Sequence, residues 1–88
     1  MVDKKIVLVT GASRGIGMGI LDYLAGKGLY TIVGTSRGEA GVDLISERCK
    51  QHGVEGCGLR CDLTDQSSID ELVSSCHSRY GYPQILVN

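Results

Sequence analysis

Short apolar runs alternate along the chain with segments in which apolar residues recur at helical spacing. Four runs, at residues 6–9, 30–35, 58–61 and 85–87, have the length of strands buried on both faces. Between them, residues 16–24, residues 42–52 and a segment that Thr64 or Asp65 would cap and that runs to about 80 have helical periodicity. We expect glycines to end these helices, namely Gly26 and Gly28, Gly53, and Gly81.

Each predicted helix has an apolar face that should be buried. These faces consist of Ile16, Ile20, Leu21 and Leu24 in the first helix, Leu44, Ile45 and Cys49 in the second, and Ile69, Leu72, Val73 and Cys76 in the third. The order β-α-β-α-β-α-β requires parallel strands joined by right-handed crossovers. It predicts an α/β fold of the Rossmann type, the N-terminal half of a doubly wound parallel sheet. Such sheets continue beyond a fourth strand, so we expect residues 1–88 to be a truncated part of one domain.

Composition narrows the classes of function. The 88 residues allow one domain at most, and the formal net charge of −1 argues against a nucleic-acid-binding surface. No apolar stretch approaches the ~18 residues of a membrane span, and the N-terminus does not resemble a secretory signal. We therefore expect a cytoplasmic protein with no membrane partner.

The four cysteines suggest a metal site only weakly. Cys49, His52, Cys57 and Cys61 follow the spacing C-x2-H-x4-C-x3-C, which is not a usual zinc-ligand spacing. The alternative, small buried thiols kept reduced in the cytosol, is favoured, and we expect no metal site.

A glycine-rich turn, Thr10-Gly-Ala-Ser-Arg-Gly-Ile-Gly17, joins the first predicted strand to the first helix. Gly11 would permit the sharp turn, Gly15 would let the backbone approach a pyrophosphate, and Gly17 would let the helix pack closely. The turn is not a P-loop, which needs a Gly-Lys-Ser/Thr sequence, and Ile20 replaces the last glycine of the G-x-G-x-x-G pattern. A plain strand–helix turn is the alternative.

The spacing T-G-x3-G-x-G resembles that of the short-chain dehydrogenase/reductase family, and within it most closely the bacterial-type 3-oxoacyl-acyl-carrier-protein reductases. Cys61-Asp62-Leu63 resembles the segment that meets adenine in that family, and residues 85–88 resemble the opening of its N-N-A-G motif. The resemblance implies cofactor-binding roles for three groups of residues: the diphosphate turn (Thr10, Gly11, Ser13, Arg14, Gly15, Ile16, Gly17), the adenine contacts (Asp62, Leu63) and the ribose contact (Asn88).

The segment after the second strand bears on the choice between NADP(H) and NAD(H). Residues 34–38 contain no carboxylate, whereas an NAD site usually has one here to bind the ribose 2′-hydroxyl. Arg37, twenty residues after Gly17, and Arg14 could bind a 2′-phosphate through charge-assisted hydrogen bonds. NADP(H) is therefore the expected cofactor. Two solvated surface arginines are the alternative, and Glu39 would weaken the inference if it faced the ribose.

The resemblance also implies the chemistry. The family uses a Ser and a Tyr-x3-Lys pair to protonate the reduced carbonyl, and that pair follows the N-N-A-G motif. Tyr23 and Lys27 have this spacing but lie on the first predicted helix, so we interpret them as a chance match and expect no catalytic residue in residues 1–88.

The expected function is binding NADP(H) within a reductase that transfers hydride to a ketone, with a 3-oxoacyl thioester as substrate. Expected partners are the dinucleotide, a second copy of the chain and, for the whole enzyme, acyl carrier protein. Alternatives are a non-catalytic nucleotide-binding module and an assembly piece that needs another chain to complete its sheet.

Overall fold

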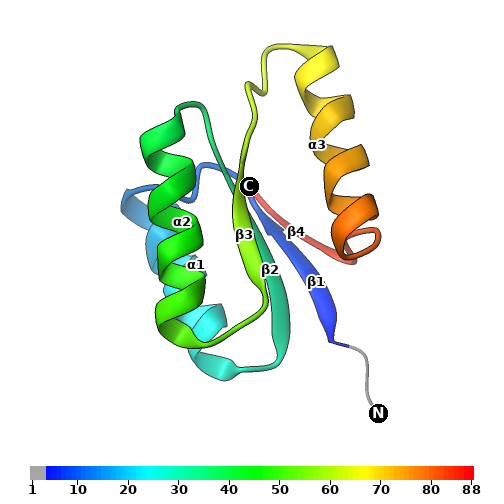
Figure 1. Cartoon of the computed structure of the whole chain (residues 1–88). Coiled ribbons are helices and arrows are strands. Elements are labelled where there is room, and N and C mark those ends of the chain that lie inside the picture. The colour runs from blue at the N-terminus through cyan, green and yellow to red at the C-terminus, as the bar shows by residue number, and fades with distance from the viewer. Residues whose placement is uncertain (1–3) are drawn as a thin grey trace.

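The four apolar runs form one parallel sheet in the order β3-β2-β1-β4. The computed structural model describes residues 4–88. The elements, in chain order, are β1 (Lys5–Val9), α1 (Gly15–Lys27), β2 (Tyr30–Ser36), α2 (Glu39–His52), β3 (Gly56–Arg60), α3 (Gln66–Arg79) and β4 (Ile85–Val87) (Figure 1). This arrangement confirms the predicted α/β, Rossmann-like fold.

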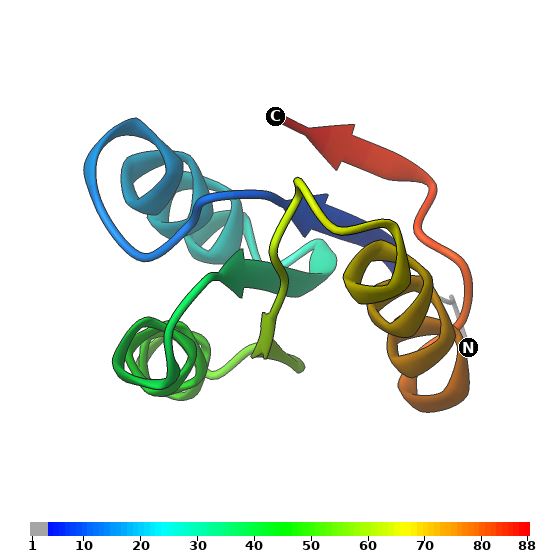
Figure 2. The ribbon, with the colours of Figure 1, turned by 90° about the horizontal axis from the view of Figure 1, so that it is seen from above.

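The helices cover both faces of the sheet. Helices α1 and α2 lie on one face and α3 lies on the other (Figure 2). The alternation of side chains along β1 separates the two cores: Val7 and Val9 pack with Leu21 of α1, whereas Ile6 and Leu8 pack with the α3 side chains. A strand buried on both faces reads as a continuous apolar run, which is why the sequence gives no alternation there.

Two predicted boundaries were wrong by two or three residues. Helix α2 begins at Glu39, not at residue 42, and Gly38 is its N-cap. The connection from β2 to α2 is therefore shorter than predicted. Strand β3 covers Gly56–Arg60 instead of residues 58–61, because Gly56 pairs with Ile32 of β2 and extends the ladder. In the first helix, Gly26 lies inside α1, and Gly28, in a left-handed conformation, is the C-cap.

Three apolar side chains are not buried as predicted. Ile16 is 84% exposed because it lies in the first turn of α1, ahead of the part of the helix that packs on the sheet. Leu44 and Val73 are also exposed, because the buried stripes of α2 and α3 are narrower than their apolar patterns. The remaining members of the predicted faces pack in or against the two cores.

No disulfide joins the four cysteines. All four are free thiols, and Cys49, Cys61 and Cys76 are buried. Within residues 4–88, no three potential ligand side chains come together around a metal position. The same part of the chain has no helix that is both long and apolar enough to cross a membrane.

A polar cluster joins α1 to α2. The Asp22 carboxylate accepts hydrogen bonds from Arg48 and pairs with His52 Nε2 at 3.1 Å. Burial alone would raise the pKa of Asp22, but the bonds to Arg48 and His52 outweigh it and hold the pKa below its usual value. The cluster therefore stabilises the packing of these two helices when Asp22 is charged.

This cluster predicts a pH-dependent contribution to stability. Because the folded-state pKa of Asp22 is lowered, its contribution is complete above the usual carboxylate pKa of about 4 and is lost as the pH falls through the lowered value. Urea unfolding should show that Asp22→Asn is less stable than the parent at pH 7, and that the difference disappears at the acid end. Glu47→Gln, on the same helix as Arg48, is the control; an Asp22→Asn deficit that persists undiminished in acid would contradict the prediction.

The contact between Gly17 and the turn predicts a steric effect. A Cβ at Gly17 would overlap the carbonyl oxygen of Gly11, and backbone would have to move. We expect Gly17→Ala to lower the free energy of unfolding by about 1–3 kcal/mol. Gly19→Ala is the matched control, because a Cβ there meets no atom within 4 Å and alanine favours the helix by up to about 1 kcal/mol. Equal stability of the two variants in urea unfolding would refute this account.

Candidate cofactor-binding site

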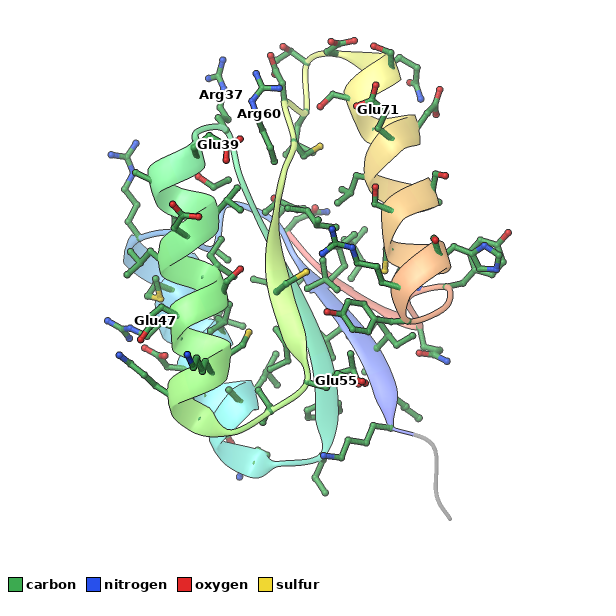
Figure 3. The ribbon with its side chains drawn as sticks, in the orientation of Figure 1. Arg37, Glu39, Glu47, Glu55, Arg60 and Glu71 are labelled. Atoms are coloured by element: carbon green, nitrogen blue, oxygen red, sulfur yellow. The ribbon has the colours of Figure 1, made fainter. Side chains whose placement is uncertain are left out.

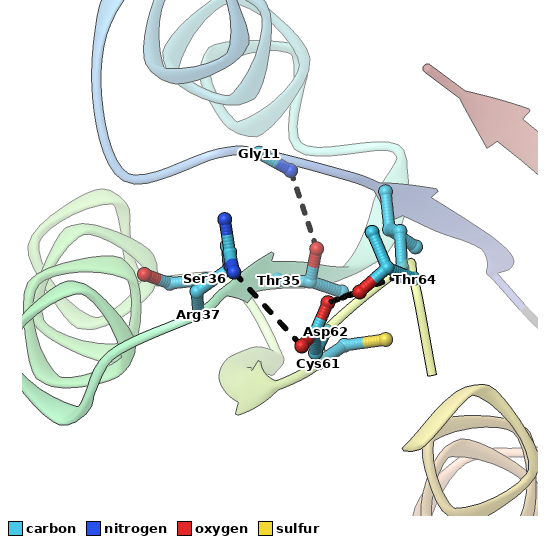
Figure 4. A pocket seen from close by; sticks show the side chains of 8 residues that line it. Gly11, Thr35, Ser36, Arg37, Cys61, Asp62 and Thr64 are labelled. Atoms are coloured by element: carbon cyan, nitrogen blue, oxygen red, sulfur yellow. Dashed lines mark hydrogen bonds and ion pairs between the residues drawn. The ribbon is translucent and has the colours of Figure 1, made fainter. Parts of the chain in front are cut away.

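The carboxyl ends of β1, β2 and β3 meet at one edge of the sheet, and two adjoining cavities lie there. The first, of about 270 Å³, is lined by Gly11, Thr35, Ser36, Arg37, Cys61, Asp62, Leu63 and Thr64 (Figure 4). The second, of about 360 Å³, is lined by Gly11, Ser13, Arg14, Ser36, Arg37, Gly38 and Gly41. Because three residues line both cavities, the cavities form a continuous groove across the ends of the strands.

The glycine turn forms one wall of this groove. Gly11 and Gly15 both have φ of +61°, which side chains other than glycine disfavour. The Gly11 N–H donates to Thr35 Oγ1 at 3.2 Å, and the Ala12 N–H donates to the Thr35 carbonyl oxygen at 2.9 Å. The turn after β1 is thus fixed to the end of β2. A Cβ at Gly11 or Gly15 would meet no atom within 4 Å, so open space lies above both.

The amino end of α1 lacks the neutralising groups found at the other two helices. Its N-cap, Arg14, is extended, no described side chain caps it, and its first turn has no acidic residue. Helix α2, by contrast, has Glu39 in its first turn, and Asp65 caps α3 by accepting from the Ser67 N–H. The free N–H groups and partial positive charge of α1 are therefore available to an anion.

Arg37 and Asp62 face each other across the first cavity. Their charged atoms, Arg37 Nη2 and Asp62 Oδ2, are 3.9 Å apart, and the Arg37 side chain is 80% exposed. Asp62 also accepts from the Thr64 hydroxyl at 2.7 Å and from the Thr64 N–H at 3.0 Å (Figure 4). These two bonds, with smaller effects from Arg37 and Arg60, lower the pKa of Asp62, so the carboxylate is charged at neutral pH.

The structure brings together six of the eleven residues that the sequence nominated. Those that line the groove are Gly11, Ser13, Arg14, Arg37, Asp62 and Leu63. Gly15, Ile16 and Gly17 line neither cavity and form the first turn of α1 beside it. Glu39 is exposed at the start of α2 and also lines neither cavity.

Thr10 and Asn88 lie in a separate, mostly apolar cavity of about 360 Å³ between α3 and β4. The Thr10 hydroxyl lies 3.3 Å from both Asn88 Oδ1 and the Val87 carbonyl oxygen. Leu63 lines this cavity as well as the groove, so the two spaces adjoin. Thr10 and Asn88 are therefore next to the groove and not inside it.

Several residues of the groove were not nominated as site residues from the sequence, although some belong to segments that it singled out. They are Thr35, Ser36, Gly38, Gly41, Cys61 and Thr64. The Ser36 hydroxyl lies 3.4 Å from Ser13 Oγ, and a Cβ at Gly41 would overlap the Ser36 side chain. The positions of these residues could have indicated them, because the residues that directly follow parallel strands meet at the carboxyl edge of the sheet whatever their side chains.

Tyr23 and Lys27 lie away from this edge. Both are exposed in the second half of α1, and Lys27 Nζ stands 4.8 Å from the centroid of the Tyr23 ring. Since α1 starts at the carboxyl edge and runs back along the sheet, its last turns approach the opposite edge (Figure 1). Neither residue lines a cavity of the groove.

The groove suits an elongated anionic ligand. Arg14 lines the second cavity next to the free N–H groups of α1, Asp62 lines the first cavity, and Arg37 lines both. The open glycines leave room for phosphate oxygens next to the backbone. These residues fit a dinucleotide cofactor, with its diphosphate over the turn.

Comparison with known proteins gives the family. The sequence model described as short chain dehydrogenase matches residues 5–88. The 3-oxoacyl-acyl-carrier-protein reductase of Escherichia coli is 42% identical over 86 residues, which cover 98% of this chain and 34% of that protein. The reductases of the same name from Pseudomonas aeruginosa and Buchnera aphidicola are 39% and 33% identical, over 99% and 97% of this chain and 35% and 34% of their own lengths.

The chain thus spans about a third of the length of the curated relatives it matches. The match extends through the glycine turn, the three strand ends that form the groove and β4. The turn, the parallel sheet and the sequence similarity agree: the chain belongs to the short-chain dehydrogenase family.

Proposed function

We propose that residues 1–88 are the N-terminal, NADP(H)-binding part of a short-chain reductase. The observation that carries this proposal is the groove itself, in which the glycine turn beside the uncapped end of α1 shares a cavity with Arg37. Membership of an oxidoreductase family supports a redox role. NADPH, when bound, supplies the hydride.

The chain's own residues bind and orient the cofactor in this proposal. The N–H groups of the first turn of α1, together with Ser13 and Arg14, hold the diphosphate. Asp62 accepts from the amino group of adenine, and Leu63 packs against its ring. Thr10 and Asn88, which lie within hydrogen-bonding distance of each other, border the riboses.

The preference for a 2′-phosphate rests on charge. Arg37 follows β2 where a ribose would lie, and the carboxylate that could select NAD(H), Glu39, lines neither cavity. Thr64 donates both of its hydrogen bonds to Asp62 Oδ1, so Oδ2 is the oxygen that could accept from adenine. A 2′-phosphate would pair with Arg37 through charge-assisted bonds.

The names of the relatives support a proposal for the substrate and the partner of the whole enzyme. Their names describe reductases of 3-oxoacyl groups on acyl carrier protein, so we propose a ketone, a 3-oxoacyl thioester, as the class of substrate and acyl carrier protein as the partner of the whole enzyme. A cytoplasmic location accords with this activity. Exposed Leu86 on β4 favours a second candidate, in which the chain is a non-catalytic assembly piece that pairs with another copy.

Cofactor choice can be tested at Arg37. Arg37→Asp should weaken NADPH binding about ten- to a hundredfold and spare or improve NADH binding, because a charge-assisted contact is replaced by repulsion. Calorimetric titration of both cofactors measures the effect. Arg79→Asp, at the far end of α3, is the control for the loss of an arginine. Unchanged NADPH affinity in Arg37→Asp would remove Arg37 from the site.

A second test concerns catalysis. Residues 1–88 alone should not oxidise NADPH in the presence of an acetoacetyl thioester, because a positioned proton donor contributes roughly 10²–10⁴-fold and the Tyr23 and Lys27 pair lines neither cavity of the groove. The measurement is NADPH absorbance over time with protein of 9.4 kDa confirmed by mass. Turnover that is abolished in Tyr23→Phe would show that Tyr23 and Lys27 are catalytic after all.

A further inference from the structure

A third arginine, Arg60, lines neither cavity of the groove but contacts the main chain of Arg37, which lines both. Arg60 is the last residue of β3, and its backbone pairs with Ser36, the last residue of β2. Its Nε donates to the Arg37 carbonyl oxygen at 3.1 Å. Figure 3 shows the side chains of Arg37 and Arg60 extending together beyond the carboxyl edge of the sheet.

The bond to the carbonyl gives Arg60 a structural contact and leaves it other donors. A guanidinium has five N–H groups, and this bond uses one. The Arg37 main chain is therefore anchored to β3, while the Arg37 side chain is free to turn towards a ligand. Holding the backbone of a flexible arginine reduces the conformational freedom that binding would otherwise have to remove.

Charge balance gives Arg60 a further effect. Asp62 lies 3.9 Å from Arg37 and would by itself neutralise it, and Glu39 begins the neighbouring helix. With Arg37 alone, this region would carry one positive charge against these two carboxylates. Arg60, which also acts on Asp62, balances these two carboxylates, so an added phosphate does not meet a net negative charge from these four groups.

We propose that Arg60 is a positioning and specificity residue, which anchors the main chain of Arg37 and supplies a further guanidinium, besides those of Arg37 and Arg14, for a 2′-phosphate on the ribose. This inference rests on the proposed dinucleotide site and deepens it. Asp62 then serves as the internal counter-ion of Arg37 in the free protein, and the 2′-phosphate displaces it as the partner of Arg37 and also pairs with Arg60.

The test compares NADP⁺ with NAD⁺, which differ only in the 2′-phosphate, by calorimetric titration of the parent protein and four variants. Arg60→Gln should weaken NADP⁺ about three- to tenfold and leave NAD⁺ unchanged, since exposed charge pairs are partly screened. Arg60→Lys, which keeps the charge, should recover part of the loss. Arg37→Gln should lose NADP⁺ preference, and Arg79→Gln should retain it. A higher salt concentration should reduce the difference between the parent and Arg60→Gln.

The outcomes separate the two proposals. If Arg37→Gln loses the preference for NADP⁺ but Arg60→Gln keeps it, the role of Arg60 is wrong and the proposed function stands. If Arg60→Gln weakens both cofactors equally, Arg60 supports the fold only and is not a specificity residue. If the parent protein binds neither cofactor, or prefers NAD⁺, both proposals fail. Circular dichroism melting of each variant identifies any loss that comes from unfolding.

Discussion

Thr35 connects the parts of the molecule on which the groove depends. It is buried near the end of β2, and both its hydroxyl and its carbonyl oxygen accept N–H groups from the turn after β1. The turn therefore cannot move independently of the sheet, and neither can the start of α1, which follows it directly. Arg37 stands only two residues further along. One residue thus connects the turn that leads into α1 with the segment that carries Arg37.

At the carboxyl edge of the sheet, the local charge depends on where acidic residues are absent as well as on where charged residues are present. The chain neutralises the amino ends of α2 and α3 with Glu39 and Asp65 but leaves the end of α1 bare. At the other end of the groove, Asp62 is kept charged by Thr64 and sits opposite Arg37. A protein with a formal net charge of −1 can thus present a local site for phosphates without a basic surface.

The sequence was sufficient for the order of elements because each local signal agreed with the others. Apolar runs, helical spacing and Gly28 and Gly53 as helix stops all indicated the same parallel sheet. A close approach was predicted at Gly17, and the structure places it against the backbone of the turn at Gly11 and Ala12. Periodicity does not show how far a helix projects beyond the sheet, so the exposure of Ile16 was missed. Arg60 was missed for a different reason. Its contact with Arg37 joins two residues 23 positions apart in the sequence, and no local sequence pattern indicates such a pair.

Leu63 links the groove to the apolar surface between α3 and β4. It is 53% exposed and lines both the first cavity of the groove and the neighbouring apolar cavity, where Leu86 and Val73 are also exposed. Any segment or second chain that covers those apolar side chains would also contact Leu63, because the two cavities share it. Burial of that apolar surface and the shape of the first cavity are therefore coupled through the Leu63 side chain. Thr10 and Asn88 lie on the same border, so the ribose contacts proposed for them depend on that cover as well.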